Sequence, residues 1–97
     1  MFTSILEVKE KDNTTTIVNM KNINHIETCV NDNEDIVEKE LYDSEHFIEA
    51  LYKMKNFGKG KITIVMNDHK NYHFIAQDVE KAIFSFSNEK MTFHFEK

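Results

Sequence analysis

The sequence predicts an α+β fold in which about eight antiparallel strands flank one central helix, in the order ββββ-α-ββββ. Three observations support this fold class. Apolar residues alternate with a period of two over the first forty residues and again after residue 60. Between these two groups, from residue 44, the apolar spacing becomes that of a helix. Short clusters rich in Asn, Asp and Lys separate the strands and are typical of turns.

The first strand group, about residues 1–41, is expected to contain four strands. In its opening stretch Leu6 and Val8 share one face, so this strand is half-buried. The second strand is rich in β-branched residues, which favour strands. Turns are predicted at KDN, at Asn22–Asn24 and at NDN, and the strands between them are expected at 2–10, 14–20, 25–30 and 34–41.

A helix is predicted near residues 44–57 because Phe47, Ile48, Leu51 and Met54 form an apolar stripe. Asp43 or Ser44 is expected to cap its N-terminus, where a side-chain oxygen can accept hydrogen bonds from free backbone N–H groups. Gly58 is placed to end the helix, since glycine readily adopts the left-handed conformation that closes many helices.

The second strand group, about residues 61–96, repeats the pattern of the first, with strands expected at 61–67, 72–76, 82–87 and 91–96. Shifting the chain by 56 residues without a gap superposes seven apolar positions, among them Leu6 on Ile62 and Val8 on Ile64. A duplicated unit and two independently similar strand groups both fit this match. We therefore expect two similar halves and leave their origin open.

Composition restricts the class of protein further. Ninety-seven residues with 40% apolar content suit a single domain spanning 1–97. No apolar run reaches the roughly 20 residues that cross a bilayer, and the N-terminus lacks the pattern of a signal peptide. Cys29 is the only cysteine, which excludes a disulfide framework. We therefore expect a cytoplasmic protein that does not associate with membranes, and, because so small a domain has a small core, one that forms homo-oligomers.

The stretch KMKNFGKGK, residues 53–61, concentrates four lysines and both glycines in an acidic chain. A phosphate-binding loop leads from a strand into a helix, whereas here the helix comes first. The stretch is therefore better interpreted as a helix end, where lysines complement the carbonyl end of the helix dipole. An alternative interpretation is a site that binds a nucleotide or another small anion, which the predicted residues Lys55, Lys59 and Lys61 would form.

Neither metal binding nor catalysis is indicated. His25 and Cys29 share a strand face but lie about 13 Å apart, too far to share one ion. His69 and His73 are four residues apart, but the turn and strand expected between them would not align their side chains as a helix would. His46 and His94 have no cysteine or histidine nearby, and no known catalytic motif occurs. The phenylalanines near the C-terminus are expected to pack in the core, since stacking sites for nucleic acid have basic surroundings. We therefore expect no enzyme, no cofactor and no direct nucleic-acid binding.

Charge is distributed unevenly. Residues 1–45 carry eleven acids and four lysines, a net charge of −7, whereas residues 46–97 carry a net charge of +2. Eight of the acids lie within residues 27–45, which we call the acidic segment. On an alternating strand, Glu34, Glu38 and Glu40 share a face at a spacing of about 7 Å. The residues predicted to contact a partner are Asp32, Glu34, Asp35, Glu38, Glu40 and Asp43.

In its size, its acidic strand and its lack of catalytic motifs, the chain resembles the small acidic inhibitors that phages and mobile elements encode against host defence. Such inhibitors act on nucleic-acid-handling host proteins, some by mimicking nucleic acid. The resemblance implies a non-enzymatic protein that binds a basic host protein such as a nuclease. Two alternatives remain open: the acidic strand is only a solvated face that prevents aggregation, or the domain has a structural role through self-association.

Overall fold

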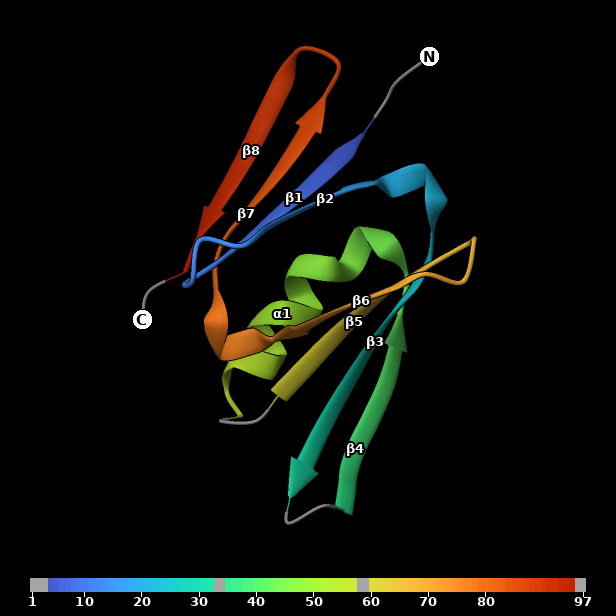
Figure 1. The fold of residues 1–97 in the computed structure, drawn as a ribbon, viewed down its shortest axis with the longest axis vertical. Coiled ribbons are helices and arrows are strands. Elements are labelled where there is room, and N and C mark those ends of the chain that lie inside the picture. Colours follow the sequence, from blue (N-terminus) through green and yellow to red (C-terminus); the bar gives the residue numbers. More distant parts are fainter. Residues whose placement is uncertain (1–3, 33–34, 58–59, 96–97) are drawn as a thin grey trace. The chain divides into compact units, whose positions relative to one another are not determined.

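The computed structural model describes residues 4–32, 35–57 and 60–95, and all of their side chains except those of residues 31–38. Within these residues it contains eight strands and one α-helix, which confirms the predicted α+β class and the order ββββ-α-ββββ (Figure 1). Three short 3₁₀ turns join the elements. The strands are β1 (Ile5–Glu10), β2 (Thr15–Asn19), β3 (Ile23–Asp32), β4 (Asp35–Tyr42), β5 (Gly60–Met66), β6 (Asn71–Ile75), β7 (Val79–Phe86) and β8 (Glu89–His94). The helix is α1 (Phe47–Lys55), and the 3₁₀ turns are η1 (Met20–Asn22), η2 (Ser44–His46) and η3 (Ala76–Asp78).

The strands form two antiparallel sheets, each of which takes one hairpin from each strand group. Sheet A has the order β2-β1-β7-β8, and sheet B has the order β4-β3-β5-β6. The chain accordingly divides into two compact units. The first contains sheet A and comprises Met1–Asn22 and Asp78–Lys97, and the second contains sheet B and α1 and comprises Ile23–Gln77. The sheets therefore do not correspond to the two strand groups seen in the sequence.

The two halves of the chain are structural repeats, 56 residues apart. The hairpin turns show this most directly, because Asn13 and His69 both adopt a left-handed conformation, with φ of 71° and 72°. One residue before each of them, Asp12 and Asp68 accept a hydrogen bond from the backbone N–H two residues further on, at 2.9 and 3.1 Å. The match found in the sequence thus extends to backbone conformation and side-chain hydrogen bonds.

Strand pairing repeats with the same offset. Leu6 lies opposite Val18 in sheet A, and Ile62 lies opposite Phe74 in sheet B. The pairing between hairpins also contains the same irregularity in each sheet. The ladder between β1 and β7 skips Glu80, and the ladder between β5 and β3 skips Asn24, again 56 residues apart. Such a bulge places an extra residue opposite one partner residue and changes the direction of its side chain.

In the second unit, α1 packs on β3 and β5 and covers one face of sheet B (Figure 1). The helix buries Phe47, Ala50, Leu51 and Met54. The strands bury the alternating residues of one face, among them Ile26, Ile62 and Ile64, which are fully inaccessible to solvent. The alternating apolar residues of the strands and the apolar stripe of the helix thus pack together in one core.

The helix differs from its prediction at both ends. The predicted first turn, Ser44–His46, is the 3₁₀ turn η2, and the α-helix follows it from Phe47. The helix ends at Lys55, two residues before the predicted end at residue 57. The expected N-cap, Asp43 or Ser44, is wrong, because the N-cap residue of α1 is His46, and Asp43 at the start of η2 makes no side-chain capping hydrogen bond. Instead the first turn is closed by the backbone N–H of His46, which donates to the carbonyl of Asp43 at 2.9 Å. Gly58, the predicted C-terminal residue, lies outside the described residues.

In the first unit, sheet A buries Leu6, Val8, Val18 and Ala82 on one face. The phenylalanines of β7 and β8 contact one another on the same face. The Phe84 and Phe86 rings stack with centroids 6.5 Å apart, and Phe84 meets Phe93 edge to face at 5.9 Å. Phe84 is buried, whereas Phe86 at the end of β7 stays 38% exposed.

Candidate functional site

The acidic segment runs from β3 through β4 into η2, and the structure describes only part of it. Glu34 lies outside the described residues, and so do the side chains of Asp32, Asp35 and Glu38. The ladder between β3 and β4 shifts register after Val30, so that Glu38 lies opposite Val30 but Ile36 lies opposite Asn31. The pairing of β4 with β3 is therefore irregular where the sequence predicted an evenly spaced column of carboxylates.

Glu40 has intramolecular partners on both of its carboxylate oxygens. It lies opposite Thr28, a buried residue on the face of sheet B that α1 covers. The Lys53 ammonium on α1 donates to one oxygen, and the Tyr42 hydroxyl donates to the other at 2.8 Å. Burial raises the pKa of the Tyr42 hydroxyl, and its hydrogen bond to the Glu40 carboxylate adds to the effect. Glu40 thus ties β4 to the helix.

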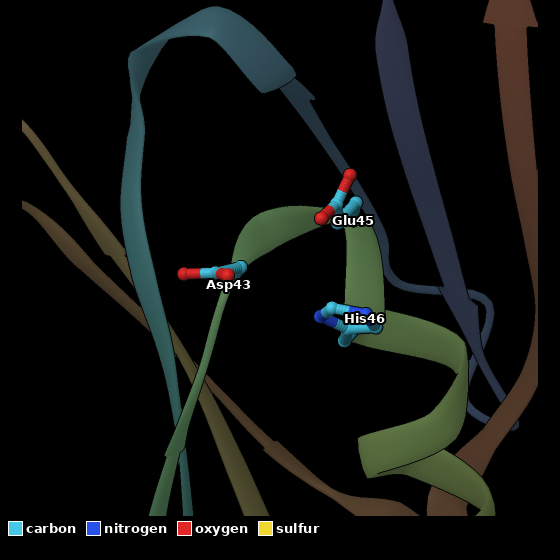
Figure 2. Close-up of side chains that lie close together, drawn as sticks. All are labelled: Asp43, Glu45 and His46. Carbon is cyan, nitrogen blue, oxygen red and sulfur yellow. The ribbon is translucent and has the colours of Figure 1, made fainter.

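Asp43 and Glu45 are the exposed carboxylates at the end of the segment, and the half-exposed His46 lies beside them. Figure 2 shows Asp43 where β4 ends, and Glu45 and His46 on the turn that leads into α1. The nearest ligand atoms of the three side chains all lie within 4.8 Å of one another. The 3₁₀ turn produces this grouping because it brings residues three apart close together.

Two carboxylates and one imidazole are ligand types that divalent metal ions accept in proteins. The sequence interpretation did not find this grouping, because it compared His46 only with other histidines and with cysteine. The local signal was the short sequence DSEH, in which carboxylates stand beside a histidine. Because exposed acidic groups often lie together without binding an ion, we interpret the cluster as part of an acidic surface.

The acidic surface continues onto the exposed side of α1. Glu49 lies four residues after Glu45, and Tyr52 lies three residues after Glu49, so the three follow one side of the helix. Glu49 is exposed, and the Tyr52 side chain is 52% exposed. We call the described set Asp43, Glu45, Glu49 and Tyr52 the acidic patch.

The lysine-rich stretch ends the helix and does not form one cationic group. The Lys55 ammonium donates to the carbonyl of Ala76 at 2.8 Å, and Gln77 donates to the carbonyl of Lys55. Lys61 lies on β5 opposite Cys29, on the exposed face of sheet B. Lys59 lies outside the described residues. Lys55 therefore has a hydrogen-bond partner at the end of the helix. Of the described lysines of the alternative anion site, only Lys61 is exposed to solvent.

Gly60 has a packing role at this helix end. A Cβ atom at residue 60 would lie 2.4 Å from the carbonyl oxygen of Met54, a distance that atoms in contact do not reach. The start of β5 therefore lies directly against the last turn of α1, and only glycine fits there. This close approach explains one of the two glycines without a bound phosphate.

On the exposed face of sheet B, the histidine of β3 is hydrogen-bonded to its neighbours. The His25 ring lies 3.0 Å from the Glu27 carboxylate and 2.7 Å from the Asn24 side-chain oxygen. The hydrogen bond with His25 lowers the pKa of Glu27, and the positive charges of Lys39, His25 and His73 act in the same direction. His25 thus helps to keep the Glu27 carboxylate ionised.

A scan against protein-family models and searches of curated proteins and of solved structures found no match to this chain. In the described part of the chain, no helix has both the length and the apolar character needed to cross a membrane.

Proposed function

We propose that the protein is a non-enzymatic inhibitor that binds a basic surface of a nucleic-acid-handling protein, such as a nuclease, through its acidic segment. The observation that carries the proposal is the concentration of eight acids in residues 27–45, within a chain whose remainder is slightly basic. Charge of one sign gathered on one region accelerates association with an oppositely charged surface and selects against acidic partners.

The acidic patch supports a contact that includes the start of α1. Asp43, Glu45 and Glu49 are exposed, whereas the Glu40 carboxylate is occupied by Lys53 and Tyr42. An exposed tyrosine beside these acids adds an apolar surface of the kind that is enriched at binding hot spots. The carboxylates are carried by a folded turn and helix, so little ordering is required when they bind.

A basic groove that binds nucleic acid is the natural target of such a surface, because it already selects closely spaced negative charges. The described patch places three carboxylates within seven residues, from Asp43 to Glu49. The partner would thus be recognised by its charge and by the spacing of its lysines and arginines, and the protein would act by occupying the groove.

The test is affinity capture from host lysate with the wild-type chain and three variants. The first variant, E34Q/E38Q/E40Q, changes the strand, and the second, D43N/E45Q/E49Q, changes the patch. The third, E7Q/E10Q/E89Q, removes the same charge from sheet A as a matched control. We expect wild type and control to capture the same nucleic-acid-handling protein, and the patch variant to lose most of it.

Each other result either contradicts the proposal or changes which part of the acidic segment makes the contact. Equal loss in all three variants would mean that net charge alone causes the capture. Capture that survives both test variants at low salt and at about 0.3 M salt would exclude the acidic segment as the contact. Loss in the strand variant alone would move the contact to β4, and capture of no basic protein would favour a solvated face.

A further inference from the structure

Sheet A carries a row of two lysines and one histidine on its exposed face. Lys9 on β1 lies directly opposite Lys81 on β7, and Lys81 lies directly opposite His94 on β8. Their neighbours along the strands, Val8, Ala82 and Phe95, are buried, so these three side chains point to the other face of the sheet. Directly opposed side chains have Cβ atoms about 5 Å apart, and like charges at that distance destabilise a sheet.

No acid in the described part of the chain pairs with this row. The described residues offer no ion pair or side-chain hydrogen bond to Lys9, Lys81 or His94. The nearest acid on the same face of β1 is Glu7, two residues or about 7 Å along the strand. Glu10 lies opposite the buried Val79 and therefore faces the other side of the sheet.

In sheet B, the position equivalent to Lys81 has hydrogen-bonding partners. His25 corresponds to Lys81, and it has Glu27 at 3.0 Å and Asn24 at 2.7 Å. Fifty-six residues later, the position of Glu27 is occupied by Ile83. Sheet A therefore lacks a carboxylate at the position of Glu27, and its acid in this region, Glu80, takes the position of Asn24.

An open cleft of 360 Å³ lies against the row and is lined by Lys9, Glu80, Lys81, His94 and Phe95. This volume is at the lower end of the range for small-molecule sites. The bulge at Glu80 forms one wall, and the backbone N–H of Phe95 fixes it by donating to the Glu80 carbonyl at 3.0 Å. Two lysines, one histidine and one acid thus surround a space large enough for an anionic group with a small organic body.

We infer that this cleft binds the phosphate group of a small molecule. Two lysines and a histidine provide donors from three adjacent strands to the several oxygens of one phosphate, and charge-assisted hydrogen bonds of this kind are strong. Binding also removes the repulsion between Lys9 and Lys81. The row spans only three side chains, with Glu7 on one side and Glu80 in the cleft, so a nucleic-acid backbone would meet negative charge after a single phosphate.

This cleft is separate from the acidic segment. It is also separate from the lysine-rich stretch, residues 53–61, for which an anion site was the alternative interpretation of the sequence. Glu80 narrows the choice of ligand further. A carboxylate in the wall repels a second negative group, so the cleft favours a ligand with one phosphate and a neutral or hydrogen-bond-donating body. Phosphate monoesters are the class that fits.

The test is a titration of the full-length, ¹⁵N-labelled protein with orthophosphate at low ionic strength, followed by NMR. We expect saturable shifts at Lys9, Lys81 and His94, and no such shifts at Lys61. The variant K9Q/K81Q should weaken binding by at least about tenfold, because each charged donor contributes more than a neutral hydrogen bond. The variant K21Q/K70Q removes the same charge at exposed positions elsewhere and should leave the affinity unchanged within about twofold.

A second readout separates a binding role from a structural one. If Lys9 and Lys81 repel one another, K81Q should raise the thermal midpoint of the free protein at low salt and abolish the further rise that phosphate gives to wild type. A lower midpoint in K81Q without phosphate would contradict the repulsion on which the inference depends. Non-saturable shifts, or equal weakening in K21Q/K70Q, would overturn the site.

Two further probes define the ligand class. Acetate should bind at least about tenfold more weakly than orthophosphate, because it has one negative charge and two oxygens. Equal affinity for acetate would overturn the assignment to phosphate. A single-stranded oligonucleotide that bound more tightly per phosphate than orthophosphate would overturn the assignment to a small molecule.

Discussion

Sheets A and B have the same topology, and the β1–β2 and β1–β7 pairs repeat the register and bulge of the β5–β6 and β5–β3 pairs, yet the exposed faces of the two sheets differ in charge. In sheet B, Glu27 and Asn24 hydrogen-bond with His25, whereas in sheet A Lys9, Lys81 and His94 have no ion pair or side-chain hydrogen bond with the described residues, although Glu80 lines the same cleft. The backbone of a repeat is therefore maintained by its apolar residues and turns, while its exposed face is free to change. Function in this protein is expected where the two faces differ.

The largest effects should come from the core positions that the repeats share. Leu6 and Ile62 occupy equivalent positions and are both 0% exposed. We expect Leu6→Ala and Ile62→Ala each to lower the free energy of unfolding by about 2–4 kcal/mol, because each leaves a cavity. Urea denaturation measures this, with the exposed Ile17→Ala as the control. A variant close to wild type in stability would show that the two sheets are not equivalently packed.

Gly60 tests a position at which the repeats differ. Its equivalent on the first half is Ser4, which carries a side chain without difficulty, whereas a Cβ at residue 60 would meet the carbonyl of Met54. We expect Gly60→Ala to destabilise the protein by about 1–3 kcal/mol through overpacking. Ser4→Ala should change stability by less than about 0.5 kcal/mol. Equal small effects in both variants would mean that α1 moves easily away from β5.

At Thr28, a substitution is expected to stabilise the protein. It is 1% exposed, its hydroxyl makes no hydrogen bond with the described residues, and its equivalent in sheet A is the apolar Phe84. A buried hydroxyl without a partner is costly, so Thr28→Val should raise the free energy of unfolding by about 1 kcal/mol. Thermal unfolding measures the gain, and Thr28→Ser, which keeps the hydroxyl, should not show it.

The smallest effect concerns pH and the His25–Glu27 pair. Because the hydrogen bond with His25 lowers the pKa of Glu27, this carboxylate stabilises the fold fully above its unfolded value of 4.5. The stabilisation is lost as the pH falls through the lower, folded-state pKa. Glu27→Gln should therefore lose less stability than wild type between pH 6 and 3, by under about 1 kcal/mol for so exposed a pair.

The control for this prediction is Glu89→Gln, which removes the same charge from sheet A. Chemical denaturation at each pH, carried out for wild type and both variants, gives the comparison. A wild-type profile parallel to that of Glu27→Gln would show that the hydrogen bond with His25 contributes nothing to the stability of the folded state.

The sequence predicted the strands and the helix because alternation and helical spacing are local signals. All eight strands and the apolar stripe of the helix were found. The pairing of β1 with β7 was not predictable, since it depends on packing between residues far apart in the chain. For the same reason, the row of Lys9, Lys81 and His94 was not predicted, because Lys9 and Lys81 become neighbours only when these strands pair.

The candidate acidic site was predicted less completely. Composition identified the acidic segment, and alternation placed Glu40 on one face of its strand. Alternation alone does not tell which face a helix will cover, so the partnership of Glu40 with Lys53 was missed. Glu49 was missed because the acidic segment was defined on strands, whereas the exposed acids continue onto the helix.

The exchange of hairpins between the two sheets imposes an order on folding. Sheet B is made from one continuous stretch, Ile23–Gln77, whereas sheet A must join Leu6 to Phe84 from the two ends of the chain. Closing so long a loop slows the formation of contacts. During synthesis, β1 and β2 must therefore remain a hairpin that is only marginally stable alone until β7 has left the ribosome.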